Sequence, residues 1–169
     1  VKSTDKKIWL EDNQNKRSEW VIEHLKNLEL TTKSKKWPKD AIHPLQLSIN
    51  VQEAMSDGDH LVFDGGNTHF WSEIAVNLVG KKNQLTLGSV MHPGSYSLLG
   101  VGVSFALSTK KLNPKETVVL ITGDGAFLSG GLSIEAAFQE NLPIVVIVDN
   151  NGGLDCISQQ QERLFSSGT

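Results

Sequence analysis

The chain of 169 residues predicts an α/β domain built on a doubly wound, mostly parallel sheet with helices on both faces. Two stretches rich in β-branched residues, 117–122 and 143–148, are typical of strands covered on both faces. A helical pattern over 131–140 separates them, and strands that alternate with helices favour right-handed crossovers between parallel neighbours. We expect this domain to span 41–169 and to be incomplete at its C-terminal end.

Residues 1–40 differ in composition from the rest, and we expect a linker and helical tail that follows a preceding domain. They have a net charge of +3 and no glycine, whereas residues 41–169 have a net charge of −6. Apolar residues at helical spacing predict an amphipathic helix over 20–28. The lysine-rich stretch 31–36 has no apolar period and is typical of a solvated linker.

The alternation of helix and strand begins at residue 41. Helical periodicity predicts helices over 44–55, about 69–78 and 99–110. Short apolar runs predict strands over 60–63 and 84–87. Between the first of these helices and the first strand, Asp57-Gly58-Asp59 predicts a turn.

Composition excludes several classes of function. The net charge of −3 argues against a general nucleic-acid binder, which would carry a basic face. The single cysteine, Cys156, excludes an internal disulfide framework and a cysteine-based zinc site, and it favours a cytoplasmic location. The longest apolar runs are far shorter than the ~20 residues that a membrane span needs, so we expect no membrane insertion. The first ten residues carry four charges and lack the apolar core of a signal peptide.

Unusual polar residues follow the two β-branched strands. The first strand is followed by Gly123-Asp124-Gly125 and the second by Asp149-Asn150-Asn151-Gly152-Gly153. Ligands of open parallel sheets bind beyond the carboxyl ends of the strands, and neighbouring strands lie ~4.8 Å apart. We therefore expect Asp124 and Asn151 to converge, although they are 27 residues apart in the chain.

These residue types fit a magnesium–diphosphate site. Mg²⁺ takes six oxygen ligands, commonly a few from the protein and the others from phosphate and water. Asp124 offers a charged oxygen, Asn151 a neutral one and Gly153 a main-chain carbonyl. Gly123 and Gly125 let the backbone approach a diphosphate, to which the amides of Gly125 and Ala126 can donate.

Each of the two motifs also occurs in turns and loops that bind no ligand. A tight turn or a glycine-rich loop accounts for either motif alone, whereas both motifs at the ends of strands joined by one helix are a much more specific signal. The dinucleotide fingerprint G-x-G-x-x-G fails because Leu128 stands at its last glycine, and no P-loop occurs.

The segment 123–153, GDGAFLSGGLSIEAAFQENLPIVVIVDNNGG, closely resembles the binding motif of thiamine-diphosphate-dependent enzymes. The likeness is to the C-terminal cofactor domain of the acetolactate synthase, benzoylformate decarboxylase and oxalyl-CoA decarboxylase group, and it extends over about 43–165. Residues 91–97, MHPGSYS, depart from the glycine-rich stretch that is common in this family.

The resemblance implies a role for particular residues. The implied ligands of Mg²⁺ are Asp124, Asn151 and the Gly153 carbonyl. The implied contacts of thiamine diphosphate are Asn67, Thr68, Ser97, Leu99, Gly123, Gly125 and Ala126. Among these, the carbonyl of Ser97 would accept a hydrogen bond from the 4′-amino group, and Leu99 would support the bent cofactor. The resemblance assigns no role to His69, His92 or Cys156.

The resemblance also implies an enzyme that acts on 2-oxo acids, by acetolactate synthase-like carboligation or by decarboxylation. In this family a glutamate from a separate pyrimidine-binding domain activates the cofactor, so we expect no catalytic residue in this chain and no turnover by the chain alone. That domain would belong to the same protein or to a partner subunit, in a homodimer or tetramer. Three alternatives are a flavodoxin-like module that binds a nucleotide or flavin, a separately encoded cofactor subunit, and a remnant that binds nothing.

Overall fold

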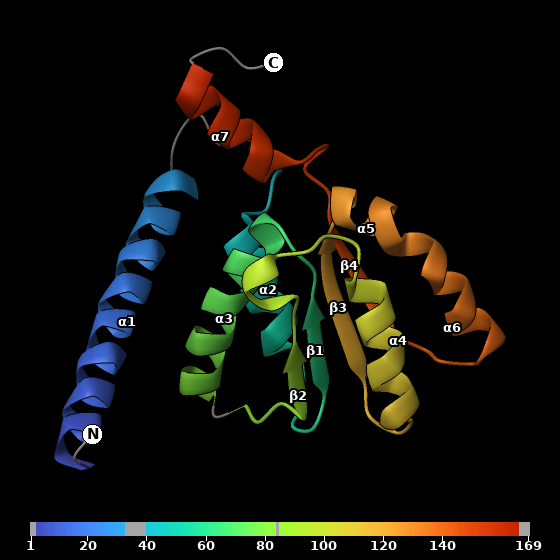
Figure 1. Cartoon of the computed structure of the whole chain (residues 1–169), viewed down its shortest axis with the longest axis horizontal. Coiled ribbons are helices and arrows are strands. Elements are labelled where there is room, and N and C mark those ends of the chain that lie inside the picture. The colour runs from blue at the N-terminus through green and yellow to red at the C-terminus, as the bar shows by residue number, and fades with distance from the viewer. Residues whose placement is uncertain (1–2, 33–39, 84, 166–169) are drawn as a thin grey trace. The chain divides into compact units, whose positions relative to one another are not determined.

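The computed structural model describes residues 3–32, 40–83 and 85–165 of the chain (Figure 1). It divides into two compact units, Val1–His43 and Pro44–Thr169. Each unit is defined by contacts among its own residues.

The described part of the first unit is dominated by one long helix, α1 (Ser3–Thr32). The predicted helix over 20–28 lies inside it. Thr31 and Thr32 are also helical, so the prediction that a linker begins at residue 31 was wrong. The remainder of that predicted linker, 33–36, lies outside the described residues.

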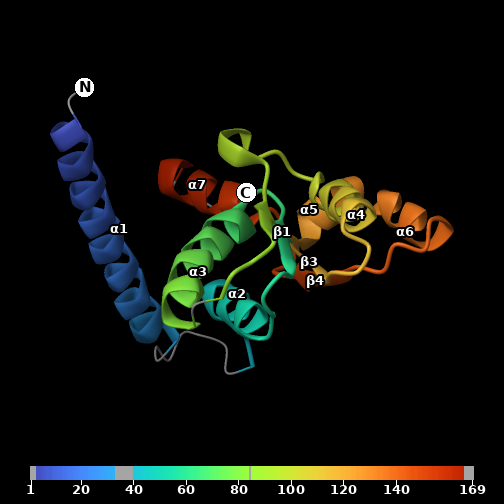
Figure 2. The same cartoon turned by 90° about the horizontal axis from the view of Figure 1, so that it is seen from below.

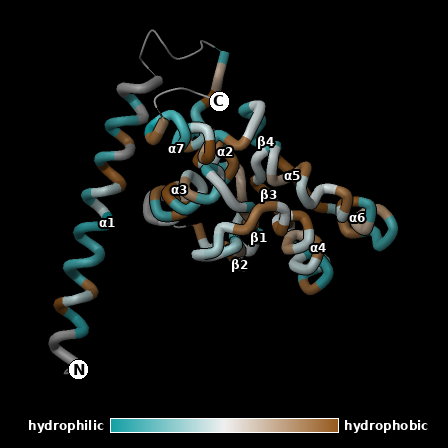
Figure 3. Tube along the Cα trace, turned by 45° about the horizontal axis from the view of Figure 1, so that its top comes forward, coloured by the Kyte–Doolittle hydropathy of each residue, from teal (hydrophilic) through white to brown (hydrophobic). Residues whose placement is uncertain are grey.

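Exposed polar residues extend α1 beyond the apolar pattern that predicted its centre. Ion pairs at i,i+4 spacing join Lys7 to Glu11 at 4.0 Å and Lys16 to Asp12 at 2.7 Å. Figure 3 shows mainly hydrophilic positions along this helix, with hydrophobic ones scattered among them. Such exposed pairs each stabilise a helix by only a few tenths of a kcal/mol, about 0.3–0.5. Local interactions of this kind between polar side chains are independent of the apolar periodicity of the sequence.

The second unit is built on a four-stranded, entirely parallel sheet with the strand order β2-β1-β3-β4. The strands are β1 (His60–Phe63), β2 (Ser89–Met91), β3 (Val118–Gly123) and β4 (Val145–Asp149). The helices are α2 (Pro44–Glu53), α3 (Asn67–Asn83), α4 (Gly102–Leu112), α5 (Asp124–Gly130), α6 (Glu135–Gln139) and α7 (Asp155–Phe165). Short 3₁₀ turns occur at η1 (Gly94–Tyr96) and η2 (Gly131–Ile134).

Apolar layers cover both faces of the sheet. On one face, Val62 and Leu120 pack with Val103 and Ala106 of α4. On the other face, Leu61, Phe63 and Ile121 pack with Val51 of α2 and Val76 of α3 (these side chains form one cluster). Figure 2 accordingly shows α2 and α3 on one side of the strands and α4 to α6 on the other. The predicted doubly wound α/β class is confirmed.

The predicted strand over 84–87 was wrong, because β2 begins at Ser89. Helix α3 continues to Asn83, and the chain next runs beside the turn that precedes β1. There Gly58 donates its N–H to the carbonyl of Thr86 at 2.9 Å, and Gly88 donates to that of Asp59 at 2.9 Å. Parallel pairing with β1 starts only at Ser89, opposite His60.

The predicted strand over 143–148 exists, but the expectation that both its faces are covered was wrong. β4 is an edge strand in the described part of the sheet, and Val145 and Val148 are 47% and 40% exposed. A β-branched run fixes the type of element, whereas its burial depends on which other elements pack against it.

Two helices begin at positions other than those predicted. The helix expected from residue 99 starts at Gly102, because Gly100 has φ +85 and cannot continue a right-handed helix. The crossover expected over 131–140 is already helical from Asp124 and is divided into α5, η2 and α6. None of the described helices is both long enough and apolar enough to cross a membrane.

Candidate functional site

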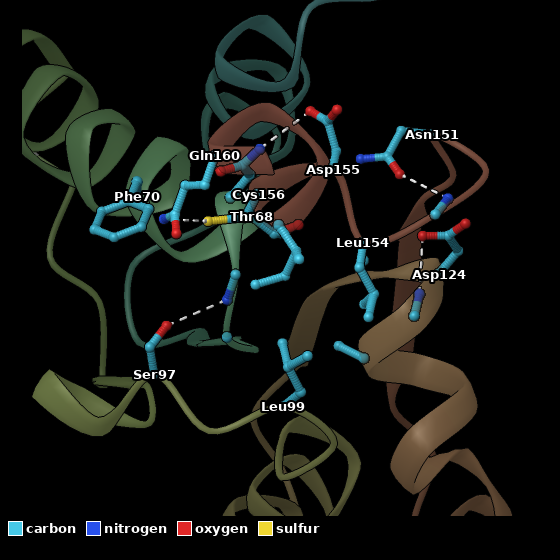
Figure 4. Close-up of a pocket in the computed structure, with 18 residues that line it drawn as sticks. Thr68, Phe70, Ser97, Leu99, Asp124, Asn151, Leu154, Asp155, Cys156 and Gln160 are labelled. Atoms are coloured by element: carbon cyan, nitrogen blue, oxygen red, sulfur yellow. Dashed lines mark hydrogen bonds between the residues drawn. The ribbon is translucent and has the colours of Figure 1, made fainter. Parts of the chain in front are cut away.

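A cavity of about 360 Å³ lies at the carboxyl end of the sheet, within the second unit (Figure 4). Its walls are built by the loops that follow β1 and β4, by the first residues of α3 and α5, by the turn before α4, and by α7. Every residue predicted from the sequence to bind cofactor or metal lines it: Asn67, Thr68, Ser97, Leu99, Gly123, Asp124, Gly125, Ala126, Asn151 and Gly153.

Asp124 connects the two polar strand ends. It is the first residue of α5, directly after β3, and its Oδ1 accepts a hydrogen bond from the N–H of Gly125 at 2.8 Å. Its Oδ2 accepts one from the N–H of Gly152, in the loop after β4, at 3.0 Å. In the same loop, Oδ1 of Asn151 accepts from the N–H of Gly153 at 3.2 Å. The structure thus brings the two segments into direct contact at the edge of the cavity.

Gly125 allows close packing at this point. A Cβ on Gly125 would lie 2.5 Å from Cδ2 of Leu154, which is another residue of the cavity wall. The Gly125 N–H points to Asp124 in this structure, whereas the sequence predicted that it would face a diphosphate. The amide of Ala126 was also expected to face a diphosphate. Ala126 is buried in the first turn of α5.

The start of α3 forms the opposite wall. Asn67 donates from Nδ2 to Oδ2 of Asp155 at 3.1 Å, and this bond joins α3 to α7. Thr68 is buried, with 5% of its surface exposed. Glycines before the helix let the chain pass close to the next segment, because a Cβ on Gly65 would overlap the Ser97 carbonyl oxygen.

Ser97 and Leu99 lie on the turn that leads into α4. Ser97 has φ +46, a left-handed conformation that is uncommon outside glycine, and its Oγ accepts from the N–H of Gly66 at 3.3 Å. A Cβ on Gly66 would lie 3.5 Å from Cδ2 of Leu99, so the leucine packs directly over this glycine. Leu99 was predicted at the start of a helix, and the structure places it in the turn before α4.

The charged side chains in the described wall of the cavity are acidic. Asp124 and Asp155 are in its wall, and none of the described residues that line it is a lysine, arginine or histidine. Burial raises the pKa of nearby Asp149, and the charges of Asp124 and Asp155 raise it further. An anionic group would be repelled by these carboxylates unless a cation lay between them.

A metal ion in this cavity would need neutral ligands in addition to charged side chains. No group of three or more histidine, cysteine, aspartate or glutamate side chains is arranged to hold a metal within the described residues. An ion at Asp124 would therefore draw on amide and carbonyl oxygens and on the ligand itself, which is the usual situation of Mg²⁺ bound with phosphates.

The wall that α7 contributes was not predicted from the sequence. This helix supplies Asp155, Cys156, Ile157 and Gln160. The other lining residues that were not predicted are Gly65, Gly66, Phe70 and Leu154. An available signal was the spacing of Leu154, Ile157, Leu164 and Phe165, which is compatible with one face of a helix.

The two histidines with no assigned role do not line the cavity. His92 stacks on Phe63 with a 5.0 Å separation of ring centroids and lies 4.8 Å from the ring of His69. His69 in turn stacks on Phe70, which does line the cavity, at 5.7 Å. These rings therefore support the wall rather than face the space inside it.

Comparison with known proteins identifies the family. Residues 64–169 match the C-terminal TPP binding domain of thiamine pyrophosphate enzymes, where TPP is the same cofactor as thiamine diphosphate. The family match favours the predicted family over a flavodoxin-like module.

Among curated relatives, the chain is 32% identical to human 2-hydroxyacyl-CoA lyase 2 over 120 residues, which are 71% of this chain and 18% of that protein. It is 29% identical to acetolactate synthase of Bacillus subtilis over 130 residues, 77% of this chain and 22% of that protein. It is 30% identical to chloroplastic acetolactate synthase of Arabidopsis thaliana over 146 residues, 82% and 21% respectively. The chain thus spans about a fifth of the length of these relatives. With its parallel sheet and a family match over 64–169, the chain belongs to the thiamine pyrophosphate enzymes, as their C-terminal TPP-binding domain.

Proposed function

We propose that this chain is the cofactor domain of an enzyme that makes or breaks a carbon–carbon bond of a 2-oxo acid, and that it binds thiamine diphosphate through Mg²⁺. The observation that carries the proposal is the Asp124 carboxylate, which joins the start of α5 to the loop after β4 at a cavity without basic residues among its described lining. A divalent cation in such a cavity would offset the repulsion between a diphosphate and the carboxylates of Asp124 and Asp155.

The residues present fit this group. We assign Asp124, Asn151 and the Gly153 carbonyl to Mg²⁺, because these residues line one cavity and offer one charged and two neutral oxygens. We assign the backbone around Gly123, Gly125 and Ala126, together with Asn67 and Thr68, to the diphosphate. The Asn67 amide would exchange its bond with Asp155 for one with a phosphate oxygen.

Ser97 and Leu99 would contact the aminopyrimidine from the third side of the cavity. The Ser97 backbone is held in a left-handed conformation, and Leu99 is held over Gly66. A fixed, bulky side chain at this place would orient the two rings of the cofactor and exclude water from the space below them.

Bound thiamine diphosphate supplies the nucleophilic carbon and the electron sink that such a reaction needs. This chain's part is to hold and orient the group. The proton transfer at the pyrimidine is assigned to a glutamate of a pyrimidine-binding domain, in the same protein or in a partner subunit. We therefore expect the chain alone to bind cofactor weakly and to give no turnover.

The reaction itself is proposed from the relatives. The likeness to acetolactate synthases suggests carboligation of 2-oxo acids as the reaction of the full-length protein, and decarboxylation belongs to the same chemistry. Cleavage of a 2-hydroxyacyl substrate is a second candidate, suggested by the name of the human relative. Product analysis of the full-length protein, with a 2-oxo acid or a 2-hydroxyacyl thioester as substrate, separates the two.

The quaternary state is a further part of this proposal. Leu128, Leu132 and Phe138, on or between α5 and α6, are 82%, 93% and 86% exposed. In the proposed assembly these apolar side chains would lie on a surface that a neighbouring subunit or domain covers. Analytical ultracentrifugation of the full-length protein tests for the expected dimer or tetramer, and a monomer would contradict it. The cytoplasmic location stays a prediction, to be tested by cell fractionation.

The metal assignment predicts the effect of one substitution. Asp124→Ala should weaken binding of thiamine diphosphate in the presence of Mg²⁺ by roughly 10- to 100-fold, as expected for loss of a charged ligand. Isothermal titration calorimetry measures it. Glu116→Ala is the matched control, since it makes the same change of charge at an exposed residue outside the cavity. Equal affinity of Asp124→Ala and Glu116→Ala would remove Asp124 from the site.

A further inference from the structure

One carboxylate at the same edge of the sheet is fully enclosed. Asp64, directly after β1, has 1% of its surface exposed and is not among the residues that line the cavity. Its Oδ1 accepts from the N–H groups of Gly65 at 2.8 Å and Gly100 at 3.0 Å. Its Oδ2 accepts from the N–H of Gly102 at 3.0 Å and from Oγ1 of Thr122 at 3.4 Å. One side chain thus joins the end of β1, the turn before α4 and the end of β3.

The bond to Gly102 caps a helix from a distance. The first N–H groups of a helix have no partner inside it, and Val101, at the N-cap of α4, provides no side-chain hydrogen bond. Asp64, 38 residues earlier in the chain, takes this place. Its negative charge at the N-terminus of an 11-residue helix is also favourable to the helix dipole.

The turn that Asp64 contacts contains backbone conformations that other contacts must stabilise. Ser97 and Gly100 both have positive φ, +46 and +85. The turn also fits closely against Asp64, because a Cβ on Gly102 would lie 2.7 Å from its Oδ2. Leu99 stands between Ser97 and Gly100 and lines the cavity (Figure 4).

We propose that Asp64 is a positioning residue, which fixes the turn 97–102 and thereby holds Leu99 against the bound cofactor. The proposal rests on the proposed function insofar as Leu99 contacts thiamine diphosphate. The anchoring itself depends only on the hydrogen bonds of Asp64. Asp64 acts through the turn, because its own atoms are enclosed behind the cavity wall.

Amide hydrogen exchange tests the anchoring in the unchanged chain, without cofactor. The N–H groups of Gly100 and Gly102 should exchange as slowly as those of β3, because a buried carboxylate accepts both. Exchange as fast as that of an exposed loop would overturn the proposal, whatever the behaviour of any variant.

The substitution Asp64→Asn tests the consequence for binding. Its carboxamide keeps the shape but has one acceptor oxygen, so a donor NH₂ group would face either Gly100 or Gly102. The affinity for thiamine diphosphate with Mg²⁺ should fall about tenfold, the effect of losing one hydrogen bond to a charged group. Exchange at Gly100 or Gly102 should become faster, and the near-ultraviolet circular dichroism induced in the bound cofactor should change.

Gln52→Ala is the control for a loss of stability alone. Gln52 is fully buried in α2, where it donates to the carbonyl of Ser72, and it makes no hydrogen bond to the turn. This variant should be destabilised while its cofactor affinity stays within about twofold of the unchanged chain. The same affinity in Asp64→Asn and in the unchanged chain would overturn the positioning role and leave the proposed function intact. No binding by the unchanged chain would overturn the proposed function, and hydrogen exchange would still decide the anchoring.

Discussion

Two aspartates at the carboxyl end of the sheet show how the surroundings of a residue decide its use. Three backbone N–H groups donate to Asp64, whose side chain is 1% exposed, so its carboxylate is used within the fold. Asp124 accepts from two backbone N–H groups and lines the cavity, so lone pairs remain for a ligand. The first therefore supports the wall of the site, and the second is placed to bind a cation.

His69 leads to a prediction about pH. It is 6% exposed, and neither ring nitrogen has a hydrogen-bond partner among the described residues. Burial lowers its pKa, the charge of His92 lowers it further, and Glu73 opposes the shift. The unfolded chain therefore takes up a proton more readily than the folded one, so the stabilisation from neutral His69 is present above the unfolded pKa of about 6.5 and decreases as the pH falls below it.

Replacement of His69 should remove this dependence. His69→Phe keeps a ring between Phe63 and Phe70 and eliminates two buried polar atoms without partners. We expect a gain of about 1 kcal/mol at pH 8, and a larger gain at pH 5.5, in the free energy of unfolding measured with urea. A gain that is the same at both pH values would show that protonation of His69 does not affect stability.

At the level of elements, the sequence predicted the type of each strand and helix better than its limits. The β-branched runs correctly predicted β3 and β4, because residues of this kind favour extended backbone. The start of α4 could not be predicted, since it depends on Asp64, which is distant in the chain and caps Gly102. The position of β2 likewise depends on a contact between Gly58 and Thr86, and no local pattern contains that information.

Close packing between α5 and the turn before α4 gives a prediction at this scale. Gly130, the last residue of α5, is so close to Gly100 that a Cβ would overlap the Gly100 carbonyl. Gly130→Ala should lower the free energy of unfolding by about 1–3 kcal/mol, as overpacking does. Gly80→Ala is the control, because its Cβ would meet no atom within 4 Å and it lies inside α3.

The control should change stability in the opposite direction. Alanine loses less backbone entropy than glycine when a helix forms, so Gly80→Ala should raise the free energy of unfolding by about 0.5–1 kcal/mol. Thermal and urea unfolding of both variants provide the measurement. If Gly130→Ala were as stable as the unchanged chain, the close approach of Gly130 to Gly100 would be refuted.

At the scale of the whole molecule, the site could be predicted from the sequence to a greater extent than its surroundings. The rule that ligands bind beyond the ends of parallel strands correctly placed Asp124 and Asn151 at one cavity. Cys156 and Gln160 were missed because they depend on where the chain turns after β4. Local sequence does not fix that turn, and α7 has no strong apolar run of its own.

The division into two units gives a prediction about truncation. Among the residues that the structure describes, those that line the cavity all belong to the second unit, Pro44–Thr169. A chain of residues 44–169 should therefore bind thiamine diphosphate and Mg²⁺ with an affinity within about threefold of the full chain, which is a difference below 1 kcal/mol. Calorimetry on the two chains under the same conditions provides the comparison. Loss of binding on truncation, with the far-ultraviolet spectrum of the second unit retained, would show that residues 1–43 contribute to the site.

The central claim is that a cation joins the carboxylate of Asp124 to a diphosphate in a cavity that lacks basic side chains among its described lining residues. The dependence of cofactor binding on Mg²⁺ tests it most directly. Calorimetric titration of the unchanged chain with thiamine diphosphate should give binding in the presence of Mg²⁺ and none after the metal is removed with a chelator. Binding of equal affinity with and without the metal would contradict the claim, since the diphosphate would then be held without a cation beside Asp124.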